Sequence, residues 1–306
     1  MILYIPVLFI ALLVDRAIGD PKTPYHPVVL IGRFIGWWGR PQLYSPSLHR
    51  GIGILGWFIT VLVFTFPFLL FEYFAPWYWY IIGAPLLLKV CFAWRALEEH
   101  ARAVADALSH EERAQKASLL VSRDTSVLNE EQILSAAYES VAENLNDSII
   151  APLFWFLVLG LPGAALYRAV NTMDAMLGYT DERKNLGWWS ARMDDLFSFL
   201  PARICGIVLI LIYAGRRRLT PALRICIRDR KKRPGINGGI PMSLIAGGEG
   251  IIFEKPGVYQ IGEHRTTLRE AGYAILWTTR LSVLLFCSLA ALALVLLEGV
   301  PNIYGI

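Results

Sequence analysis

The sequence has little charge and lacks the patterns of several common enzyme classes. Only 18% of its 306 residues are charged, whereas soluble domains are typically about 25% charged. No Gly-Lys pair occurs, which excludes the P-loop of many nucleotide-binding enzymes. The four cysteines form no C-x-x-C pair, and three of them lie in or beside apolar runs. We therefore expect buried packing cysteines rather than disulfides or metal ligands.

The start of the chain also lacks the marks of a cleaved signal peptide. No basic residue precedes the apolar stretch Met1–Val14. Asp15 and Arg16 follow it, where a cleavage site would need small residues. We expect this stretch to be retained as a first membrane segment, short enough to be tilted or partial.

Apolar residues are in excess and occur in runs. The chain is 55% hydrophobic, more than a soluble core of this size can bury. A membrane-spanning helix needs about 20 mostly apolar residues. The runs of about this kind are Ile52–Phe71, Trp77–Val90, Ile149–Leu166, Leu196–Ala214 and Tyr273–Leu297. The sequence therefore predicts an all-α, polytopic protein of the cell membrane with about 4–6 membrane segments.

Two of these runs contain helix breakers. Ile149–Leu166 is interrupted near Gly160 and Pro162, and Leu196–Ala214 is interrupted by Pro201 and Arg203. Broken segments within a membrane usually line a cavity, because their free backbone groups need partners. We expect both runs to be broken, the first of them re-entrant, and to frame a pocket at the cytoplasmic face.

Polar loops separate the apolar runs within what we expect to be a single membrane domain, residues 1–306. The loops are residues 15–51, 95–148, 167–195 and 215–271. Lys and Arg near span ends mark the cytoplasmic side, which places the first and last loops inside. The helical hairpin formed by residues 52–90 crosses the membrane twice and brings the chain back to the cytoplasmic side, so loop 95–148 is also inside. If Ile149–Leu166 crosses fully, loop 167–195 lies outside. A re-entrant Ile149–Leu166 keeps loop 167–195 on the same side, and Leu196–Ala214 must then also not cross; we favour this second arrangement.

The basic run Arg228–Arg233 has two interpretations. In isolation it resembles a nucleic-acid-binding patch. In a membrane protein, a basic loop near a span more often contacts anionic lipid, and a phosphate-bearing substrate can share the same charge. We therefore expect the lipid bilayer as a partner and no nucleic acid. Glycines follow this run at Gly235–Gly239 and at Gly247, Gly248 and Gly250, where a loop would be able to cradle phosphate.

The stretch Glu130–Asp147 is predicted to form a helix. Asn129 and Gln132 have the spacing of a capping box. Leu134, Ala137, Val141 and Leu145 recur at helical spacing and form an apolar stripe. Glu139, Glu143 and Asp147 form a column on roughly the opposite face. Like charges at this spacing repel by about 0.2–0.5 kcal/mol per pair. The spacing alone favours a solvated acidic face; a metal ion or basic partners would be the alternative.

Two more polar stretches adjoin apolar runs, at Tyr167–Asp174 and Ala191–Asp195. Ionisable residues at membrane edges are functional candidates, because their burial is costly. Asp194 and Asp195 suit Mg²⁺, which typically takes one or two carboxylates together with water and phosphate oxygens. For Arg192 and Arg203, contact with lipid headgroups is an equal alternative.

Taken together, these motifs resemble those of the adenosylcobinamide-phosphate synthases of cobalamin biosynthesis, the CobD/CbiB family. The resemblance covers about residues 13 to 265, with many short motifs in the family's order. They are Gly19–Pro21 with His26–Val28 and Gly32, Arg123–Thr125, Glu139–Asn144 with Asp147, Ala151–Trp155, Pro162–Ala164, Tyr167–Thr172 with Asp174, Ala191–Asp195, and Pro201–Arg203. The sequence departs from the family pattern at residues 235–237 and 253–255, which leaves the choice of amino-alcohol open.

The resemblance implies amide-bond formation between the free propionate of adenosylcobyric acid and 1-aminopropan-2-ol phosphate or ethanolamine phosphate. ATP and Mg²⁺ are the expected energy source and ion, and other membrane proteins of cobalamin assembly are possible partners. The resemblance implies catalytic roles for Glu139, Glu143, Asp174 and His26, and metal binding by Asp147, Asp194 and Asp195. It implies substrate or phosphate binding by Arg168, Asn171, Arg192, Arg203, Asn144 and Asn237.

Two other classes of function compete with this interpretation. A membrane sensor or regulator of the same ancestry would lack the chemistry, and the retained carboxylates and Asn171 argue against it. A transporter also uses broken helices with polar residues. Its usual inverted internal repeat is not evident in the sequence.

Overall fold

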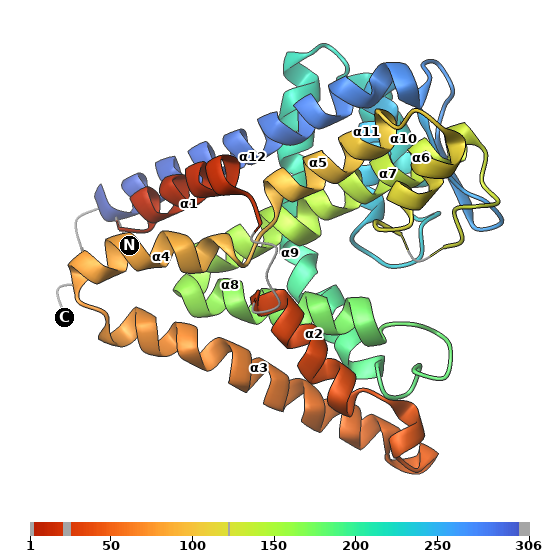
Figure 1. The fold of residues 1–306 in the computed structure, drawn as a ribbon. Coiled ribbons are helices and arrows are strands. Elements are labelled where there is room, and N and C mark those ends of the chain that lie inside the picture. Colours follow the sequence, from red (N-terminus) through yellow and green to blue (C-terminus); the bar gives the residue numbers. More distant parts are fainter. Residues whose placement is uncertain (1–2, 21–25, 122, 300–306) are drawn as a thin grey trace. The chain divides into compact units, whose positions relative to one another are not determined.

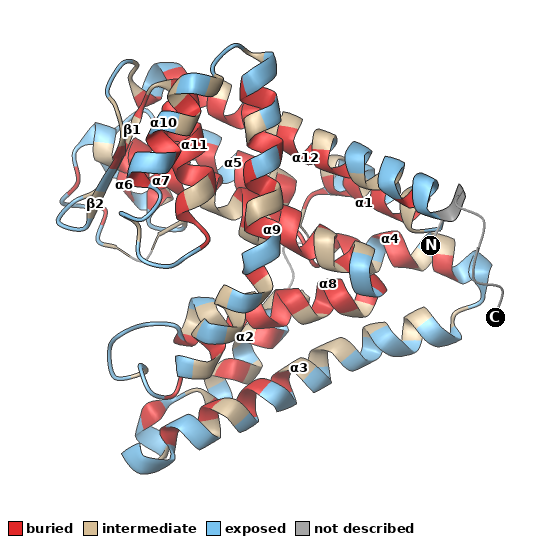
Figure 2. Cartoon of the chain, turned by 180° about the vertical axis from the view of Figure 1, so that it is seen from behind, coloured by how far each residue is buried: buried red, intermediate tan, exposed pale blue. Residues whose placement is uncertain are grey.

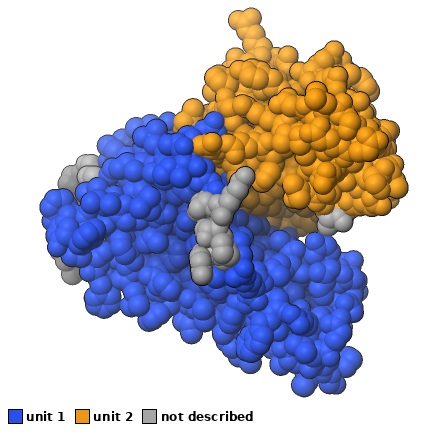
Figure 3. Space-filling model, viewed as in Figure 1, with its two compact units in different colours: residues 1–93, 151–198, 287–306 blue, residues 94–150, 199–286 orange. Residues whose placement is uncertain are grey.

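The structure of the protein, a computed structural model, describes residues 3–20, 26–121 and 123–299 (Figure 1). It divides into two compact units, coloured in Figure 3. Unit 1 consists of residues 1–93, 151–198 and 287–306, and unit 2 of residues 94–150 and 199–286. The expectation of one continuous domain stays a prediction.

Within the described ranges, five helical stretches are long and apolar enough to cross a membrane. They are Pro46–Phe74, Trp77–Ala105, Glu130–Leu177, Trp188–Gly215 and Leu268–Leu297. The predicted all-α, polytopic fold is confirmed. The first predicted segment forms helix α1 (Tyr4–Ile18), which at 15 residues is short for a span. The four cysteines are free and buried, as predicted.

Unit 1 is a bundle of apolar helices. It contains α1, α2 (Pro27–Trp38), α3 (His49–Phe74), α4 (Trp77–Lys89), α8 (Ala151–Leu177), the first part of α9 (Trp188–Gly215) and the last part of α12 (Leu268–Gly299). Two 3₁₀ turns, Pro41–Leu43 and Pro46–Leu48, precede α3. Helix α3 packs against α2 and α8, and α1 packs against α4. Ile35, Trp38, Trp57, Val170 and Met173 lie in the core.

Helix α3 presents a long apolar surface outside this core. Its buried residues are His49, Gly53, Gly56, Trp57 and Thr60, all in its first half. Figure 2 shows the exposed remainder. That remainder includes Leu55, Phe58, Leu62, Phe66 and Leu69. A patch of this length on a water-facing helix would favour aggregation, so this face is suited to lipid.

Helix α8 contains the predicted break. Gly160 has a non-helical backbone conformation, φ 69° and ψ −159°. The Trp155 indole donates to the Phe197 carbonyl oxygen at 3.0 Å, and the Tyr167 hydroxyl lies 2.9 Å from that of Ser198. In a straight helix, Trp155 and Tyr167 would be about 18 Å apart along the axis. Both reach the same turn of α9, so the chain reverses direction at Gly160.

Side chains from three other helices complete the reversal. The Leu161 N–H, the first after the break, donates to the Glu72 carboxylate at 3.0 Å. The hydroxyls of Tyr4 and Tyr80 donate to the same carboxylate at 2.9 and 3.1 Å. Pro162 then occupies the first turn of the returning arm, where its missing N–H costs nothing. Glu72 therefore caps the second arm of α8.

The returning arm of α8 leads to the same end of unit 1 as the loop before α3. Gln42 donates to the Glu182 carboxylate at 2.8 Å, and the Arg50 guanidinium lies 5.5 Å from the centre of a Trp188 ring. Glu72 and Tyr80 lie at the other end of α3 and α4. The loop at residues 178–187 and the loop at residues 39–48 therefore share one end of the bundle.

That end is predicted to face the cytoplasm. In a variant lacking the four native cysteines, Thr180→Cys should resist an impermeant maleimide until intact cells are opened. Tyr73→Cys, at the opposite end of α3 and 81% exposed, should be labelled from outside and serves as the matched control. Ready labelling of Thr180→Cys in intact cells would contradict the predicted orientation.

The prediction of a second broken run is wrong. Helix α9 continues from Trp188 to Gly215 with Pro201 inside it. Proline lacks an N–H, so the carbonyl of Phe197 loses its usual helical partner. The Trp155 indole N–H donates to this carbonyl oxygen. Because a side chain supplies the missing donor, the proline does not break the helix.

Unit 2 surrounds helix α7 (Glu130–Asn144). Helices α5 (Trp94–Ala105), α6 (His110–Ala117) and α11 (Gly239–Glu249) pack against α7, as does strand β1 (Ile252–Lys255). Helix α10 (Leu219–Asp229) packs on α11. The remaining parts of α9 and α12 complete the unit. Buried Glu249 accepts hydrogen bonds from Tyr213, Arg216 and Thr278, which ties α11 to α9 and α12.

One antiparallel hairpin interrupts the helices. β1 pairs with β2 (Tyr259–Gly262), with Lys255 opposite Tyr259 and Ile252 opposite Gly262. The predicted phosphate loop is only partly present. Gly247 and Gly248 lie inside α11, where a Cβ would come within 2.5 Å of the Pro221 carbonyl oxygen and 2.2 Å of the Tyr213 ring. These two glycines therefore serve close helix packing.

Candidate active site

The predicted site residues fall into two groups, one in each unit. Unit 1 holds His26, Arg168, Asn171, Asp174, Arg192, Asp194 and Asp195. Unit 2 holds Glu139, Glu143, Asn144, Asp147, Arg203 and Asn237. A single pocket joining both groups stays a prediction. Pro21 of the opening motif lies outside the described residues.

In unit 2, the carboxylate of Glu139 is buried and fully engaged. It accepts hydrogen bonds from Ser135 Oγ at 2.5 Å, Arg123 Nη2 at 3.3 Å and Tyr259 Oη at 2.8 Å. Burial and the neighbouring carboxylate raise the pKa of Tyr259, so the phenol stays protonated and donates. These contacts link α7 to β2 and favour a positioning role for Glu139. Its predicted catalytic role stays a prediction.

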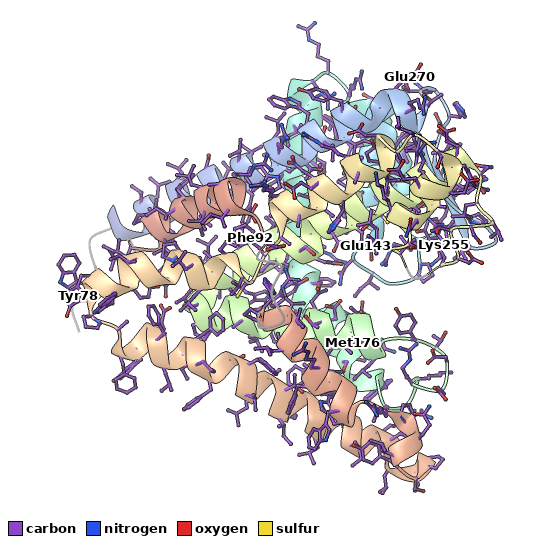
Figure 4. All side chains as sticks on the ribbon, in the orientation of Figure 1. Tyr78, Phe92, Glu143, Met176, Lys255 and Glu270 are labelled. Atoms are coloured by element: carbon purple, nitrogen blue, oxygen red, sulfur yellow. The ribbon has the colours of Figure 1, made fainter. Side chains whose placement is uncertain are left out.

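Glu143 lies one turn further along α7 (Figure 4) and pairs with Arg233 Nη2. Burial acts to lower the pKa of Arg233, and the negative charges of Glu143 and Asp147 outweigh it. With Arg123 on Glu139, the acidic column faces basic partners rather than solvent. The interpretation as a solvated acidic face is wrong, because residues far along the chain cover this side of α7.

The column ends in an unusual turn. The helix widens into a π-helix at Leu145–Ile150, which contains Asp147. Short π segments inside α-helices are frequently found at functional sites. Ser148 Oγ donates to Asn144 Oδ1 at 2.7 Å, and Asn144 donates to the Ser140 carbonyl oxygen at 3.0 Å. The wider turn displaces Asp147 from the spacing that an α-helix would give it.

Arg203 and Asn237 form the other predicted pair in unit 2. Arg203 Nη1 donates to Asn237 Oδ1 at 2.5 Å, and Nη2 donates to the Ile236 carbonyl oxygen at 3.2 Å. The guanidinium also lies 3.6 Å from the centre of the Phe199 ring. Arg203 therefore anchors the loop before α11 to α9. These hydrogen bonds favour this anchoring role over a simple contact of Arg203 with lipid headgroups.

In unit 1, the two polar stretches after the break come together. Asn171 Nδ2 on α8 donates to Asp194 Oδ1 on α9 at 3.2 Å. Asp174 lies one turn beyond Asn171, against the backbone of Gly178. A Cβ on Gly178 would come within 2.1 Å of the Asp174 Oδ1 atom. Glycine at this position therefore lets the Asp174 carboxylate lie beside the end of α8.

The remaining predicted residues of unit 1 differ in exposure. Arg168 is buried, and its Nε donates to the Cys91 carbonyl oxygen at 2.8 Å, which ties α8 to the end of α4. Asp195 is partly buried, whereas Arg192 is exposed on α9. Their predicted roles in binding phosphate and metal stay predictions.

His26 caps helix α2. Its Nδ1 accepts a hydrogen bond from the Val28 N–H at 3.2 Å, so the neutral ring carries its proton on Nε2. Nε2 lies 4.0 Å from Asp20 Oδ1. Burial lowers the pKa of His26, with Asp20 opposing and Lys89 and Arg168 acting in the same direction. Nε2 has no hydrogen-bond partner among the described residues. Because the cap occupies the lone pair of Nδ1 and Nε2 carries the proton, a role as general base is not favoured.

His26→Asn should therefore keep most of the enzymatic rate, since asparagine is also a good helix cap. His26→Ala should lower the free energy of unfolding by about 1 kcal/mol. If His26 were the general base, both variants would instead lose about 100- to 10,000-fold in rate. Comparing product formation with denaturant unfolding for the two variants separates these roles.

His26 makes the free energy of unfolding depend on pH in a definite direction. The pKa of His26 is lower in the folded chain than its ordinary value of about 6.5. As pH falls, the unfolded chain therefore takes up this proton first. The stability contributed by the neutral ring is present above about pH 6.5 and is lost as pH falls toward the folded pKa. His26→Asn should flatten this part of the stability curve.

One buried lysine was not predicted from the sequence. Lys89, at the end of α4, is 3% exposed and lies 3.1 Å from Asp15 Oδ1. It also pairs with Asp20, beside His26. A lysine at the end of an apolar run is a signal for a functional or structural ion pair. Arg123, Tyr259 and Arg233 were also not predicted as site residues, because their partners are distant in sequence.

The residues of the π-helix fit a hard cation. Asn146 Nδ2 donates to Asp147 Oδ1 at 2.7 Å, whereas the buried Asn146 Oδ1 lacks a hydrogen-bond partner among the described residues. Amide and carboxylate oxygens are ligands that Mg²⁺ accepts. No group of three or more His, Cys, Asp or Glu gathers in the described part of the chain. Mg²⁺ bound with a phosphate needs only one or two carboxylates, so the magnesium site stays a prediction.

Comparison with known proteins identifies the family. Residues 8–293 match the model of the CobD/Cbib protein family. A probable cobalamin biosynthesis protein CobD of Methanothermobacter thermautotrophicus is 39% identical over 268 residues, which is 85% of this chain and 87% of that protein. That of Thermococcus kodakarensis is 43% identical over 256 residues, 82% and 83% of the two chains. The cobalamin biosynthesis protein CobD of Dehalococcoides mccartyi is 35% identical over 268 residues, 84% and 86%. No solved structure matches. The chain belongs to the CobD/Cbib protein family.

Proposed function

We propose that this chain is an adenosylcobinamide-phosphate synthase that acts at the cytoplasmic face of the cell membrane. Family membership supports a role in cobalamin biosynthesis. The proposed reaction joins the free propionate of adenosylcobyric acid to the amine of 1-aminopropan-2-ol phosphate or ethanolamine phosphate. ATP supplies the energy, and Mg²⁺ accompanies its phosphates.

One observation carries the proposal: the column of acids on α7, matched by arginines, which continues to Asp147 in a π-helix. Bringing these charged groups together costs part of their hydration, and a charged ligand would offset that cost. Carboxylates with nearby guanidinium groups suit a phosphate that binds with a divalent cation. An amide synthase that activates a carboxylic acid needs this kind of site.

The chemistry needs two steps. A carboxylate oxygen of the corrinoid attacks the terminal phosphorus of ATP, and ADP leaves. The amine nitrogen then attacks the acyl carbon, the C–O bond to phosphate breaks, and the amine gives up a proton to a base. Mg²⁺, held by Asp147 and Asn146, would neutralise phosphate charge. Arginines beside the column would stabilise the charge on the departing phosphate.

Residues of unit 1 supply further polar groups at one end of the bundle. Asn171, Asp174 and Asp194 lie where α8 and α9 meet. Among them, Asp174 keeps its predicted catalytic role, and its carboxylate is only partly buried. The reversal of α8 supports a common side for these residues and the loop before α3.

The test is a product assay with the purified protein in detergent or nanodiscs. Incubation with adenosylcobyric acid, ATP, Mg²⁺ and each amino-alcohol phosphate should give a product whose mass equals the two substrates joined with loss of water. ADP should appear in equal amount. Binding of the corrinoid without product would favour a sensor or regulator. Uptake of a corrinoid into proteoliposomes without product would favour a transporter.

A further inference from the structure

We propose that Arg233 recognises the phosphate group of the amino-alcohol phosphate. To bind it, the guanidinium breaks its ion pair with Glu143. This inference rests on the proposed function and assigns a substrate contact within it. In the structure, Arg233 pairs with Glu143. When the phosphate binds, the guanidinium turns to it, and the carboxylates become available to the cation that accompanies the phosphates.

The Arg233–Glu143 pair is placed to exchange partners. The two side chains are 23% and 30% exposed, so both are within reach of a ligand. Among the described residues, the Glu143 carboxylate has no hydrogen bond or ion pair other than that with Arg233. The neighbouring Glu139 carboxylate is only 7% exposed and has three donors. Glu139 is therefore fixed, whereas Glu143 depends on a single partner.

The loop that carries Arg233 is shaped around its guanidinium group. A Cβ on Gly238 would come within 2.9 Å of Arg233 Cζ, so the glycine lets the guanidinium lie against the loop backbone. Gly235 has φ +93°, a conformation that favours glycine. Arg233 Nη1 donates to the Pro234 carbonyl oxygen at 2.6 Å. These features direct the guanidinium toward α7 rather than toward solvent.

The loop itself is anchored at another residue. Arg203 donates to Asn237 and to the Ile236 carbonyl oxygen, which fixes the loop to α9. With the backbone held there, the Arg233 side chain is able to turn without moving the loop. Arg203 is engaged in this anchor, so Arg233 is the better candidate of the two for the phosphate.

The charges favour the transfer of the Arg233 guanidinium from Glu143 to the phosphate. Guanidinium binds phosphate through two parallel hydrogen bonds, a stronger geometry than its single contact with Glu143. Once Arg233 turns away, Glu143 carries uncompensated negative charge four residues before Asp147. This charge attracts a divalent cation. Phosphate binding and cation binding are therefore coupled through one side chain.

Calorimetric titration of 1-aminopropan-2-ol phosphate, in the presence of Mg²⁺, into the purified full-length protein tests the proposal. Arg233→Ala should raise the Kd about 10- to 100-fold, the range expected for loss of charge-assisted hydrogen bonds. Unphosphorylated 1-aminopropan-2-ol should bind both proteins equally. Lys231→Ala, which removes an exposed charge from the same loop, is the matched control and should bind like the wild type.

A double variant separates phosphate recognition from simple neutralisation of Glu143. If Arg233 only neutralises Glu143, adding Glu143→Gln to Arg233→Ala should restore the wild-type Kd, and this result would overturn the proposal. We expect no recovery. If the wild-type protein binds 1-aminopropan-2-ol phosphate but forms no product, the proposed function is rejected, whereas the phosphate contact of Arg233 is retained. An unchanged Kd in Arg233→Ala, or no binding by the wild type, would reject the contact itself.

Discussion

Asp147→Asn is expected to lower the rate of product formation about 100- to 1000-fold, the range found when one preorganised electrostatic group is removed from an active site. Asp147 lies in the π-helix, beside Asn146 Oδ1, for which the described residues supply no hydrogen-bond donor. Asparagine preserves the shape of the side chain and removes its charge. The variant should still insert into the membrane. The rate is measured at saturating ATP over a range of Mg²⁺ concentrations.

Glu130→Gln is the matched control for this experiment. Glu130 lies in the first turn of the same helix, and its side chain is 50% exposed. Glu130 pairs with the buried Arg113 and with the exposed Arg269. In the variant, Arg113 keeps its hydrogen bonds to the carbonyl oxygens of Val104 and Ala107. This control should retain the wild-type rate. A similar rate in Asp147→Asn would mean that the acidic column only supports the fold.

Features with local causes were predictable from the sequence. Asn129 and Gln132 are three residues apart and form the capping box that their spacing predicts. Gly160 and Pro162 interrupt an apolar run, and the helix breaks at Gly160. Each of these outcomes is determined by the conformational preferences of neighbouring residues. The apolar runs likewise predicted the membrane-spanning helices, because length and composition decide that property.

The partners of the acidic column were not predictable in this way. Arg233 is 90 residues from Glu143, and Tyr259 is 120 residues from Glu139. Helical spacing shows that three carboxylates share a face, but it does not show what covers that face. The same spacing therefore suits a solvated surface or a paired site. Only the tertiary contacts separate the two.

Pro201 shows how a distant residue overrides a local preference. Proline in a helix interior removes a hydrogen bond, so the sequence predicts a break. The lost donor is replaced by Trp155, 42 residues away from Phe197. The hairpin at Ile252–Gly262 was missed for a related reason. Its strands of four residues each are too short to show a clear alternation, and only Pro256 and Gly257 mark the turn.

Gly160→Ala should lower the free energy of unfolding by about 3 kcal/mol or more. Gly160 has φ 69° and ψ −159°, a region that is essentially restricted to glycine. An added Cβ would come within 2.6 Å of Glu72 Oε1 and 2.8 Å of the Tyr4 hydroxyl. The substitution therefore strains the backbone and displaces the carboxylate that caps Leu161. Equilibrium unfolding in mixed micelles measures the change.

The sign of this effect distinguishes a reversed α8 from a straight one. In a continuous helix, replacing glycine with alanine stabilises by about 1 kcal/mol. Gly36→Ala provides this reference, because Gly36 lies within α2 and, apart from the adjoining backbone of α2, no atom of the described residues comes within 4 Å of the added Cβ. The control should be neutral or more stable, while Gly160→Ala should be less stable. If both variants gained stability, the chain would not reverse at Gly160. The loop at residues 178–187 would then lie at the other end of the bundle from the loop at residues 39–48, and the polar stretches of α8 and α9 would lose their common side.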